Sequence, residues 1–290
     1  MHKLALYGLG NMGIKMAERL AANYPLWVAD LNPEAVQQAQ SFGAQAITED
    51  TDLQQLELVF LCLPSPTASR SVLNAIAPRL KTGTVIVETS TVNPVDLRAC
   101  ADLVQPYGHI LIDASIMAGV SQMAAGSASL LIGGDEATVQ KYDPVFAAIA
   151  QRRIYFGASG TGAAAKVINN AVAHAVMVVV AEAGSMATAA GVDRQKLIEL
   201  LSDPQMGLHR PLTHRYAERI AQGNYEGGMP LEAARKDSVL ALELAQQLEV
   251  PLFAIQGSHS VYDMALRSGL GRQDYAALAC LWEQWQRPTY

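Results

Sequence analysis

The chain has little cysteine, little charge and few aromatic side chains. Of its 290 residues, 3 are cysteine, 17 % are charged and 6 % are aromatic. The cysteines, Cys62, Cys100 and Cys280, are scattered and odd in number, which predicts neither a disulfide framework nor a Cys/His metal site. We therefore expect no bound metal and a reducing, cytoplasmic environment.

Basic residues are scarce as well, with 21 Lys and Arg against 27 Asp and Glu and a net charge of -6. Proteins that bind nucleic acid or anionic membranes usually carry the opposite balance, so we expect neither partner. The N-terminus lacks the apolar core and cleavage site of a signal peptide. The longest apolar run, 171–181, is interrupted by His174 and is too short to cross a bilayer, which predicts a buried helix.

Apolar residues make up 50 % of the chain, enough for one large or two modest domains with cores of their own. This high content also indicates apolar surface left over for subunit contacts. We therefore expect a homodimer or a homotetramer.

The first half alternates short apolar runs with stretches of helical spacing. Such alternation with short connections predicts an α/β fold, a doubly wound parallel sheet of the Rossmann type with helices on both faces. The expected strands are 4–7, 26–29, 58–62, 84–87, 110–112, 128–132 and 153–156, and the expected helices are 12–22, 33–42, 67–80, 94–104 and 137–150.

After Gly162 the strand signals stop, and the rest of the chain has only helical spacing. We therefore predict two domains, a dinucleotide-binding domain over 1–160 and an all-helical substrate and dimerisation domain over 161–290. The helices expected in the second domain are 164–190, 194–201, 212–221, 231–248, 252–268 and 275–285.

A glycine-rich loop joins the first strand to the first helix. Gly8 permits a tight turn, Gly10 lets the backbone approach a pyrophosphate, and Gly13 allows close packing of helix on strand. The helix N-terminus adds a favourable field for the negative charge. We predict a nucleotide site made by Gly8, Leu9, Gly10, Asn11, Met12 and Gly13. The alternatives are a tight turn without a ligand and a methyltransferase loop.

Asp30 ends the second strand, at the distance expected for a carboxylate on the adenosine ribose. Its charge would repel a 2′-phosphate, and the next residues supply no arginine. We therefore expect NAD as the cofactor, with NADP less favoured. Two loops at later strand ends, which contain Leu63, Pro64 and Thr67 and then Thr91, are candidates to line the nicotinamide half. Each is equally consistent with an ordinary turn.

A second motif opens the long helix after Gly160. Lys166, Asn169 and Asn170 fall three and four residues apart, which places them on one face of an otherwise apolar helix. A lysine in such surroundings usually has a partner or a task. Burial would lower its pKa and suit it to proton transfer. The alternative is a side chain that extends along the helix to water.

These segments, in this order, resemble the β-hydroxyacid dehydrogenase family, which includes 3-hydroxyisobutyrate dehydrogenase and tartronate semialdehyde reductase. The resemblance covers nearly the whole chain, and the segment 157–170 is its most specific part. It implies that Lys166 is catalytic, that Asn170 and Asn169 orient the substrate, and that Lys236 reaches toward cofactor and substrate. Arg210 lies in a stretch that borders the substrate in that family, where it would pair with an anionic tail, unless it is a plain surface arginine.

One segment departs from the family pattern. The family usually has Asp-Ala-Pro-Val-Ser-Gly-Gly where this chain has Asp-Ala-Ser-Ile-Met-Ala-Gly over 113–119. Met117 stands at the position of the serine that would hold a substrate carboxylate or hydroxyl, and a thioether cannot donate a hydrogen bond. Gly119 is kept, and Ser115 is a candidate to replace the missing contact.

The resemblance implies hydride transfer between a nicotinamide ring and a small β-hydroxy acid or its semialdehyde, with Lys166 as general acid and base. Because of Met117, two alternatives stay open. One is an aldehyde or imine reductase of the same fold with a different substrate, although imine reductases typically carry another residue in place of the lysine. The other is a catalytically silent NAD-binding module.

Overall fold

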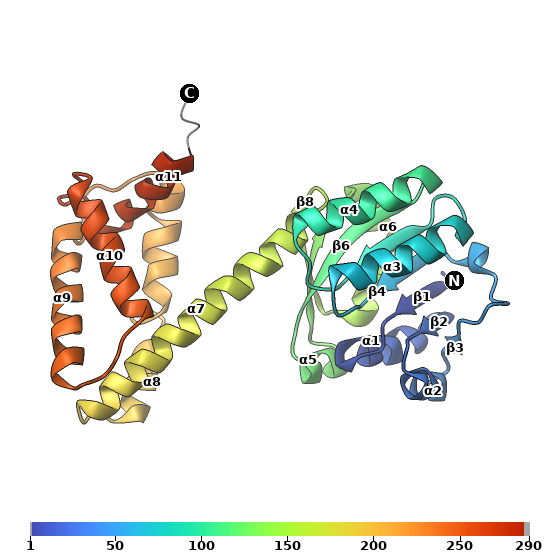
Figure 1. Cartoon of the computed structure of the whole chain (residues 1–290), viewed down its shortest axis with the longest axis horizontal. Coiled ribbons are helices and arrows are strands. Elements are labelled where there is room, and N and C mark those ends of the chain that lie inside the picture. The colour runs from blue at the N-terminus through green and yellow to red at the C-terminus, as the bar shows by residue number, and fades with distance from the viewer. Residues whose placement is uncertain (1, 287–290) are drawn as a thin grey trace. The chain divides into compact units, whose positions relative to one another are not determined.

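The computed structural model describes residues 2–286 (Figure 1). The chain forms two compact units, Met1–Ala171 and Val172–Tyr290. The change from strands to helices occurs at Gly160, and helix α7 (Thr161–Ala189) then runs without a break from the first unit into the second. The first unit therefore contains the first eleven residues of α7 in addition to the sheet.

The first unit is built on an eight-stranded sheet. Its order, β3-β2-β1-β4-β5-β6-β7-β8, runs outward in both directions from the adjacent pair β1 and β4. The strands are β1 (Leu4–Tyr7), β2 (Leu26–Ala29), β3 (Gln45–Ala46), β4 (Leu58–Leu61), β5 (Val85–Glu88), β6 (Ile110–Met117), β7 (Ser129–Gly133) and β8 (Arg152–Gly157). This doubly wound arrangement confirms the predicted fold class.

The sheet is parallel except at one junction. β7 runs antiparallel to β6, whereas β8 is again parallel to β7. The prediction of a wholly parallel sheet is therefore wrong at this point. The connection between β6 and β7 carries only the short helix α5 (Val120–Ala125), and a parallel crossover usually needs a dozen or more residues.

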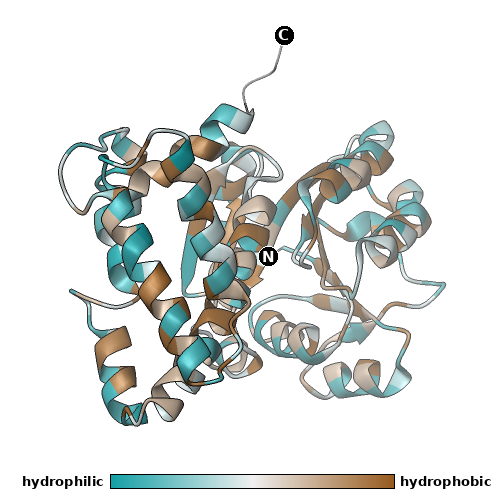
Figure 2. Ribbon diagram, turned by 60° about the vertical axis from the view of Figure 1, so that its left-hand side comes forward, coloured by the Kyte–Doolittle hydropathy of each residue, from teal (hydrophilic) through white to brown (hydrophobic). Residues whose placement is uncertain are grey.

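Side chains alternate along each strand and build a core on each face of the sheet. Leu4, Leu6 and Phe60 pack on one face beneath helices that include residues 11–21, 33–41, 120–125 and 136–149. Ala5 and Val59 point to the other face, which is covered by the helices over 66–76 and 94–104 and by the start of α7. Figure 2 shows the strands in the brown of hydrophobic residues and the helices in mixed colours.

The helices of this unit begin where capping residues and prolines favour it. Asn32, Ser65 and Asp135 each accept a hydrogen bond from a backbone amide in the first turn of the helix that follows. Proline occupies the first position of three helices, where its missing amide hydrogen costs nothing. The helices are α1 (Asn11–Ala21), α2 (Pro33–Ser41), α3 (Pro66–Ile76), α4 (Pro94–Val104) and α6 (Glu136–Ile149).

The second unit is helical, as predicted, with one irregular stretch. After α7 follow α8 (Arg194–Ser202), α9 (Leu231–Gln247), α10 (Ala254–Arg267) and α11 (Cys280–Gln286). The helix expected over 212–221 is not regular. Pro211–Ala217 is a π-helical segment, and a 3₁₀ turn follows at Ile220–Gln222. Pro211 cannot donate to the preceding turn, and π-helical pairing is one way in which the backbone accommodates such a site.

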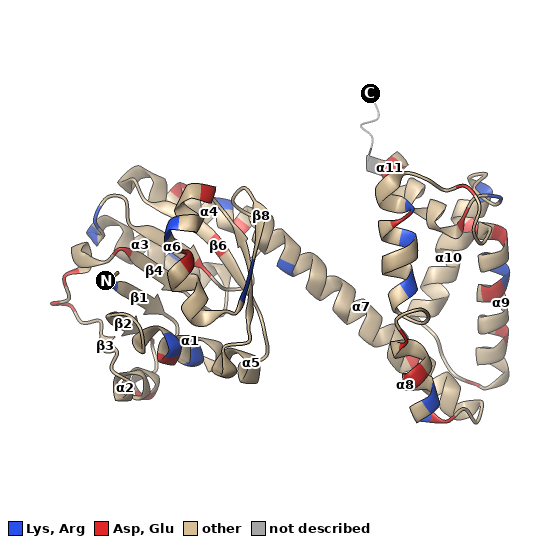
Figure 3. Cartoon of the chain, turned by 180° about the vertical axis from the view of Figure 1, so that it is seen from behind, with Lys and Arg blue, Asp and Glu red and all other residues tan. Residues whose placement is uncertain are grey.

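Helix α7 carries only two charged residues, Lys166 and Glu182, and most of it is drawn in the uncharged colour in Figure 3. By length and composition alone it could cross a membrane. The sequence predicted a buried helix, but only 6 % of its most apolar 18-residue window is buried. That prediction is wrong for the chain by itself, because apolar side chains such as Val172 and Met177 remain more than half exposed.

Glu182 joins α7 to the start of α10. Its carboxylate accepts hydrogen bonds from the backbone amides of Phe253 at 2.7 Å, Ala254 at 2.9 Å and Ile255 at 3.0 Å. These amides have no partner inside α10, and the helix dipole favours an anion there. Burial opposes ionisation of Glu182, but the three amide bonds outweigh it and lower the pKa of this carboxyl.

A second buried carboxylate organises the end of the chain. Asp274 has no exposed surface and lies beside two guanidinium groups, with Arg215 Nε at 3.3 Å and Arg219 Nε at 3.5 Å. It also accepts a hydrogen bond from the backbone amide of Ala276 at 3.0 Å, at the start of the 3₁₀ helix that precedes α11. These two ion pairs connect the irregular segment 211–222 to the start of the 3₁₀ helix that precedes α11.

Glu182→Gln is expected to destabilise the second unit by about 1–2 kcal/mol, because the amide keeps the shape but loses the charge at the helix N-terminus. Thermal unfolding measures this. The contribution of Glu182 to the free energy of unfolding is present above the unfolded-state pKa of glutamate, and it is lost as the pH falls through the lowered pKa in the folded protein. The difference in melting temperature between wild type and Glu182→Gln should therefore disappear in acid.

Glu199→Gln is the matched control, since Glu199 is an exposed helical carboxylate that pairs only with Lys196. Equal melting temperatures for Glu182→Gln and Glu199→Gln at neutral pH would contradict the capping role of Glu182.

Candidate active site

The carboxyl ends of the parallel strands share one edge of the sheet, and the candidate site is built there. The strand order reverses between β1 and β4, and ligands of doubly wound sheets bind at such a reversal. The loops that follow β1, β2, β4 and β5 all open onto this edge, and the end of β6 extends beyond it.

The loop after β1 leaves no room for side chains at two of its glycines. Gly8 has φ of +98°, and a Cβ there would collide with the carbonyl oxygen of Cys62. A Cβ on Gly13 would collide with the carbonyl oxygen of Gly8. Gly10, in contrast, is open and begins α1 without a side-chain cap. The amides at the start of α1 are thus available to an anion, and the cradle fits a dinucleotide pyrophosphate.

Asp30 holds this loop from the end of β2. Its Oδ2 accepts the backbone amide of Leu9 at 2.5 Å, and its Oδ1 accepts the backbone amide of Asn32 at 2.8 Å. The carboxylate is partly exposed beside the phosphate loop, while Gly10 and Asn11 are exposed and Met12 is half-buried. The predicted nucleotide residues are thereby brought together at one place.

The two loops predicted to line the nicotinamide half are joined by hydrogen bonds. The backbone amide of Leu63 donates to Ser90 Oγ at 2.8 Å. Thr89 donates both from its amide and from its hydroxyl to the carbonyl oxygen of Leu61. Pro64, Thr67 and Thr91 are exposed around this junction. In the sequence the two loops are separate segments, each of which could be an ordinary turn. In the structure these hydrogen bonds join them into one continuous surface.

Helix α7 is fixed to the sheet by Asp113 of β6. Its fully buried carboxylate accepts hydrogen bonds from the backbone amides of Gly160 at 2.8 Å and Ala163 at 2.7 Å. Desolvation raises the pKa of Asp113, and the amide bonds at the helix start oppose this. Sequence reasoning missed the role of Asp113. The signal was a carboxylate inside an apolar strand, which must find donors when it is buried.

Lys166 lies against Met117 at the far end of β6. Asp113 pairs with the last residue of β5, so Met117 projects about 13 Å past the end of that strand. Lys166 Nζ is 3.2 Å from Met117 Sδ, and Asn169 Nδ2 is 3.7 Å from the same sulfur. The candidate acid–base group and the residue that departs from the family pattern are therefore in contact.

Lys166 is half-buried and forms no ion pair within the described part of the chain. Burial lowers the pKa of its ammonium group. A thioether is a weak acceptor that offsets little of this effect. Asn170 lies one turn further along α7 and is also half-buried. Lys166 therefore gives up its proton at a lower pH than an ordinary exposed lysine does.

Other predicted substrate residues occupy different places. Ser115 is 1 % exposed, on the same face of β6 as Asp113 and Met117, and its hydroxyl has no hydrogen-bond partner within residues 2–286. A substrate reaches it only if neighbouring side chains move. Gly119 is exposed at the start of α5.

Arg210 and Lys236 belong to the second unit. Arg210 is exposed and donates to the carbonyl oxygen of Gln205 at 3.4 Å. Lys236 Nζ pairs with the neighbouring Asp237 at 2.8 Å on the surface of α9. Their predicted roles toward substrate and cofactor stay predictions.

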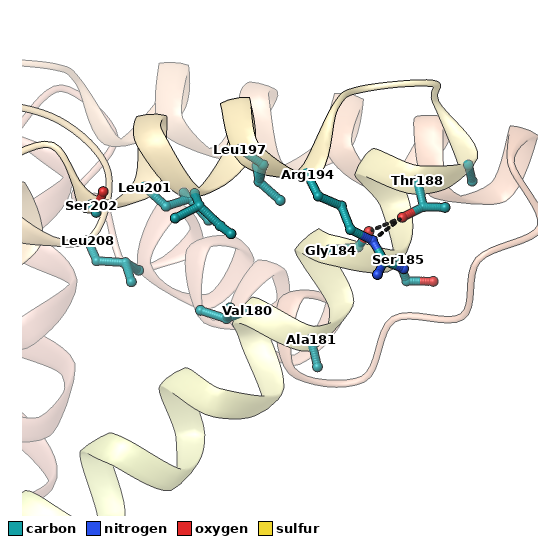
Figure 4. A pocket seen from close by; sticks show the side chains of 12 residues that line it. Val180, Ala181, Gly184, Ser185, Thr188, Arg194, Leu197, Leu201, Ser202 and Leu208 are labelled. Atoms are coloured by element: carbon teal, nitrogen blue, oxygen red, sulfur yellow. Dashed lines mark hydrogen bonds between the residues drawn. The ribbon is translucent and has the colours of Figure 1, made fainter.

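A hollow of the second unit lies between α7 and α8 and has a volume of about 780 Å³ (Figure 4). Apolar side chains such as Val180, Leu197 and Leu201 line most of it. Figure 4 shows Arg194 at its rim, with Nε 3.5 Å from Thr188 Oγ1. No carboxylate, histidine or lysine is among its lining residues. It has the chemistry of an apolar contact surface rather than that of a reaction site.

Two family models together account for almost the whole chain. The model of the NAD-binding domain of 6-phosphogluconate dehydrogenase matches residues 3–157. The model described as the NAD-binding domain of NADP-dependent 3-hydroxyisobutyrate dehydrogenase matches residues 160–282. The junction between the models coincides with the start of α7.

Individual relatives agree with these models. The chain is 27 % identical to human mitochondrial 3-hydroxyisobutyrate dehydrogenase, over 93 % of this chain and 84 % of that protein. It is 28 % identical to 3-sulfolactaldehyde reductase from Escherichia coli, over 96 % of this chain and 95 % of that protein.

Solved structures share the fold along nearly the full length. A 3-hydroxyisobutyrate dehydrogenase from Mycobacterium tuberculosis with L-serine superposes with a TM-score of 0.69 at 24 % identity, over 96 % of this chain and 98 % of that one. An imine reductase from Bacillus cereus superposes with a TM-score of 0.87 at 18 % identity, over 98 % and 99 %.

Gly162→Ala is expected to destabilise the first unit by about 1–3 kcal/mol, since overpacking at this helix start must displace rigid groups. A Cβ there would lie 2.5 Å from the carbonyl oxygen of Leu131 and 2.9 Å from Asp113 Oδ2. Gly257→Ala in α10, where nothing lies within 4 Å, is the control and should be neutral or stabilising. Similar thermal stabilities for both variants would argue against the tight seating of α7 on the sheet.

Proposed function

Because the chain belongs to the β-hydroxyacid dehydrogenase family, we propose that it is an NAD-dependent dehydrogenase of a small β-hydroxy acid, or a reductase of the matching semialdehyde. The observation that carries this proposal is the half-buried Lys166, which has no ion pair among residues 2–286 and lies at the edge of the sheet that bears the phosphate loop. The names of the relatives support the same class of substrate.

In this proposal Lys166 handles the proton of the substrate oxygen. The bound nicotinamide supplies hydride transfer to or from the carbinol carbon. In the direction of oxidation, neutral Lys166 accepts the hydroxyl proton, and in the direction of reduction the ammonium form donates it. Burial lowers the pKa of Lys166, which makes its neutral form more accessible than that of an exposed lysine and so supports both roles. Asn169 and Asn170 offer amide donors and acceptors that would orient the oxygen without adding charge.

NAD is the cofactor that we propose over NADP. Asp30 presents a carboxylate beside the phosphate loop, and its charge would repel a 2′-phosphate. The exposed residue that follows, Leu31, offers no cation. The first 160 residues would hold the dinucleotide, and the helical remainder would supply the substrate contacts of Arg210 and Lys236 and the contacts between subunits.

Met117 favours a second candidate, an aldehyde or imine reductase of the same fold. The thioether occupies the surface beside Lys166 where the family has a hydroxyl, so a substrate carboxylate would lose one donor there. Structural neighbours at high TM-score include proteins named imine reductases. The retained lysine weighs against imine reduction and favours the hydroxy acid reaction. A catalytically silent NAD-binding module is the third possibility.

A second copy of this chain is the partner that we propose for the apolar surface of the second unit. Val172, Met177 and Val178 on α7 are exposed, and so are Leu212 and Phe253. The hollow between α7 and α8 adds further apolar area. Exposed apolar side chains gathered on one unit indicate an interaction surface.

The free cysteines support the proposal of a reducing, cytoplasmic location.

Lys166→Ala is expected to lower turnover by a factor of about 100 to 10,000, the range for loss of a general acid–base group, while NADH binding is retained. A panel of hydroxy acids and aldehydes, assayed by NADH absorbance with NAD and NADP in parallel, identifies the substrate first. In wild type, a rise in pH through the lowered pKa of Lys166 should increase the rate of oxidation, which needs the neutral amine. The same rise should decrease the rate of reduction, which needs the ammonium form.

Lys196→Ala is the matched control, because this exposed lysine pairs with Glu199 on α8. Ordinary turnover by Lys166→Ala would remove the catalytic assignment. NADH binding without turnover of any compound would instead favour the silent module. A clear preference for NADP would contradict the proposed role of Asp30.

Met117→Ser is expected to raise activity on a simple 3-hydroxy acid by about tenfold, the equivalent of one regained hydrogen bond. Met117→Leu keeps the size and apolar character and serves as the control. The comparison of kcat/KM for both variants measures the effect. If Met117→Ser changes nothing, the substrate pocket differs from the family pattern at further positions.

A further inference from the structure

Glu88, the last residue of β5, is a buried carboxyl group for which the proposed proton transfer has no use. It is 1 % exposed. Its Oε1 accepts a hydrogen bond from the backbone amide of Ser90 at 2.9 Å. Its Oε2 has no hydrogen-bond partner within residues 2–286, and the hydroxyl of Ser69, fully buried on α3, faces the carboxyl and is also without one. Burial of a carboxyl group with a hydrogen bond to only one of its two oxygens costs free energy, so a function for Glu88 must be sought.

The bond from Ser90 to Glu88 continues into the neighbouring loop. Ser90 Oγ accepts the backbone amide of Leu63 at 2.8 Å, so Glu88, Ser90 and Leu63 form a chain of two hydrogen bonds across adjacent strand ends. One loop follows β4 and the other follows β5, next to the point where the strand order reverses. The carboxyl group therefore lies directly behind the surface that the two loops present.

We propose that Glu88 is a positioning residue for the nicotinamide end of the cofactor, acting through Ser90 to hold the loops 63–67 and 89–91 in one fixed surface. This inference rests on the proposed dinucleotide site, since it concerns the half of that site away from the phosphate loop. Glu88 itself, being buried, touches neither cofactor nor substrate in this role.

Burial is the main influence on the charge of Glu88 and raises its pKa, while the nearby hydroxyls of Ser69 and Ser90 and the backbone amide of Ser90 oppose this. The neutral form is then favoured up to a higher pH than usual, and it can donate to Ser69 as well as accept from Ser90. As the pH rises through the raised pKa, Glu88 becomes a buried anion without a cation beside it. The loop surface should then loosen.

Three other titratable groups lie near Glu88. Burial raises the pKa values of Cys62, just after β4, and of Cys100 on α4 to about 11. Asp113, at the same register on β6, is a second buried carboxyl whose pKa is raised by burial while the amides at the start of α7 oppose this, so the comparison with Glu88→Gln is what assigns a pH dependence to Glu88. Arg70, which follows Ser69 on α3, pairs with Asp96 on α4.

Equilibrium binding of two ligands tests the proposal. NADH carries the nicotinamide ring, and ADP-ribose lacks it but retains the pyrophosphate and both riboses. Glu88→Ala should weaken NADH binding about tenfold, as expected for a lost buried hydrogen bond, and ADP-ribose binding by less than about twofold. Glu88→Gln, a neutral isostere, should bind NADH like wild type. Ser90→Ala should reproduce the effect of Glu88→Ala, and the double variant should add little.

The pH dependence supplies an independent readout. Wild-type affinity for NADH, relative to that for ADP-ribose, should fall as the pH rises through the raised pKa of Glu88, and Glu88→Gln should lose this fall. Glu57→Gln is the matched control, because Glu57 lies just before β4 at the opposite edge of the sheet and pairs with His2.

The experiment distinguishes a failure of the positioning role of Glu88 from a failure of the dinucleotide site itself. Equal weakening of NADH and ADP-ribose by Glu88→Ala, or no change in either, would overturn the positioning role. A wild-type protein that binds neither ligand would overturn the dinucleotide site itself. A variant that still binds ADP-ribose is folded, so a loss of NADH affinity in it cannot be attributed to unfolding.

Discussion

The contact between Asp113 and the first amides of α7 is the constraint on which the candidate site depends. A buried carboxylate on β6 is costly unless donors satisfy it, and the start of a helix offers unpaired amides in the right place. The bond fixes where α7 begins, and Lys166 follows on the second turn. The same strand, four residues further on, supplies Met117 to meet that lysine. One strand thus sets both the start of the helix and the surroundings of Lys166, the proposed acid–base group.

In the second unit, too, a buried carboxylate accepts hydrogen bonds from the unpaired amides at the start of a helix. Glu182 satisfies three amides at the start of α10 and so joins α10 to α7. In both cases the carboxylate and the helix start are far apart in sequence, 47 residues for Asp113 and Gly160 and 71 for Glu182 and Phe253. Acidic side chains in apolar surroundings therefore determine how the helices of this chain are anchored.

This separation explains what the sequence could and could not predict. The phosphate loop and the lysine helix are local patterns, and both were identified with the correct neighbouring elements. The roles of Asp113 and Glu88 depend on contacts across strands, which no local spacing reveals. The direction of β7 was missed because periodicity does not encode strand direction, and the π-helical segment 211–217 because its apolar spacing imitates an α-helix.

Asp30 has a consequence for attempts to change the cofactor. Both of its oxygens are already bound to backbone amides, one in the glycine loop and one in the turn after β2. The group that we propose to discriminate against an extra phosphate thus also holds the loop that we propose to bind the pyrophosphate. Exchanging it for a small or basic residue would relax selectivity and release the loop together. A redesign toward NADP therefore needs a replacement acceptor for the amide of Leu9 as well as a cation for the phosphate.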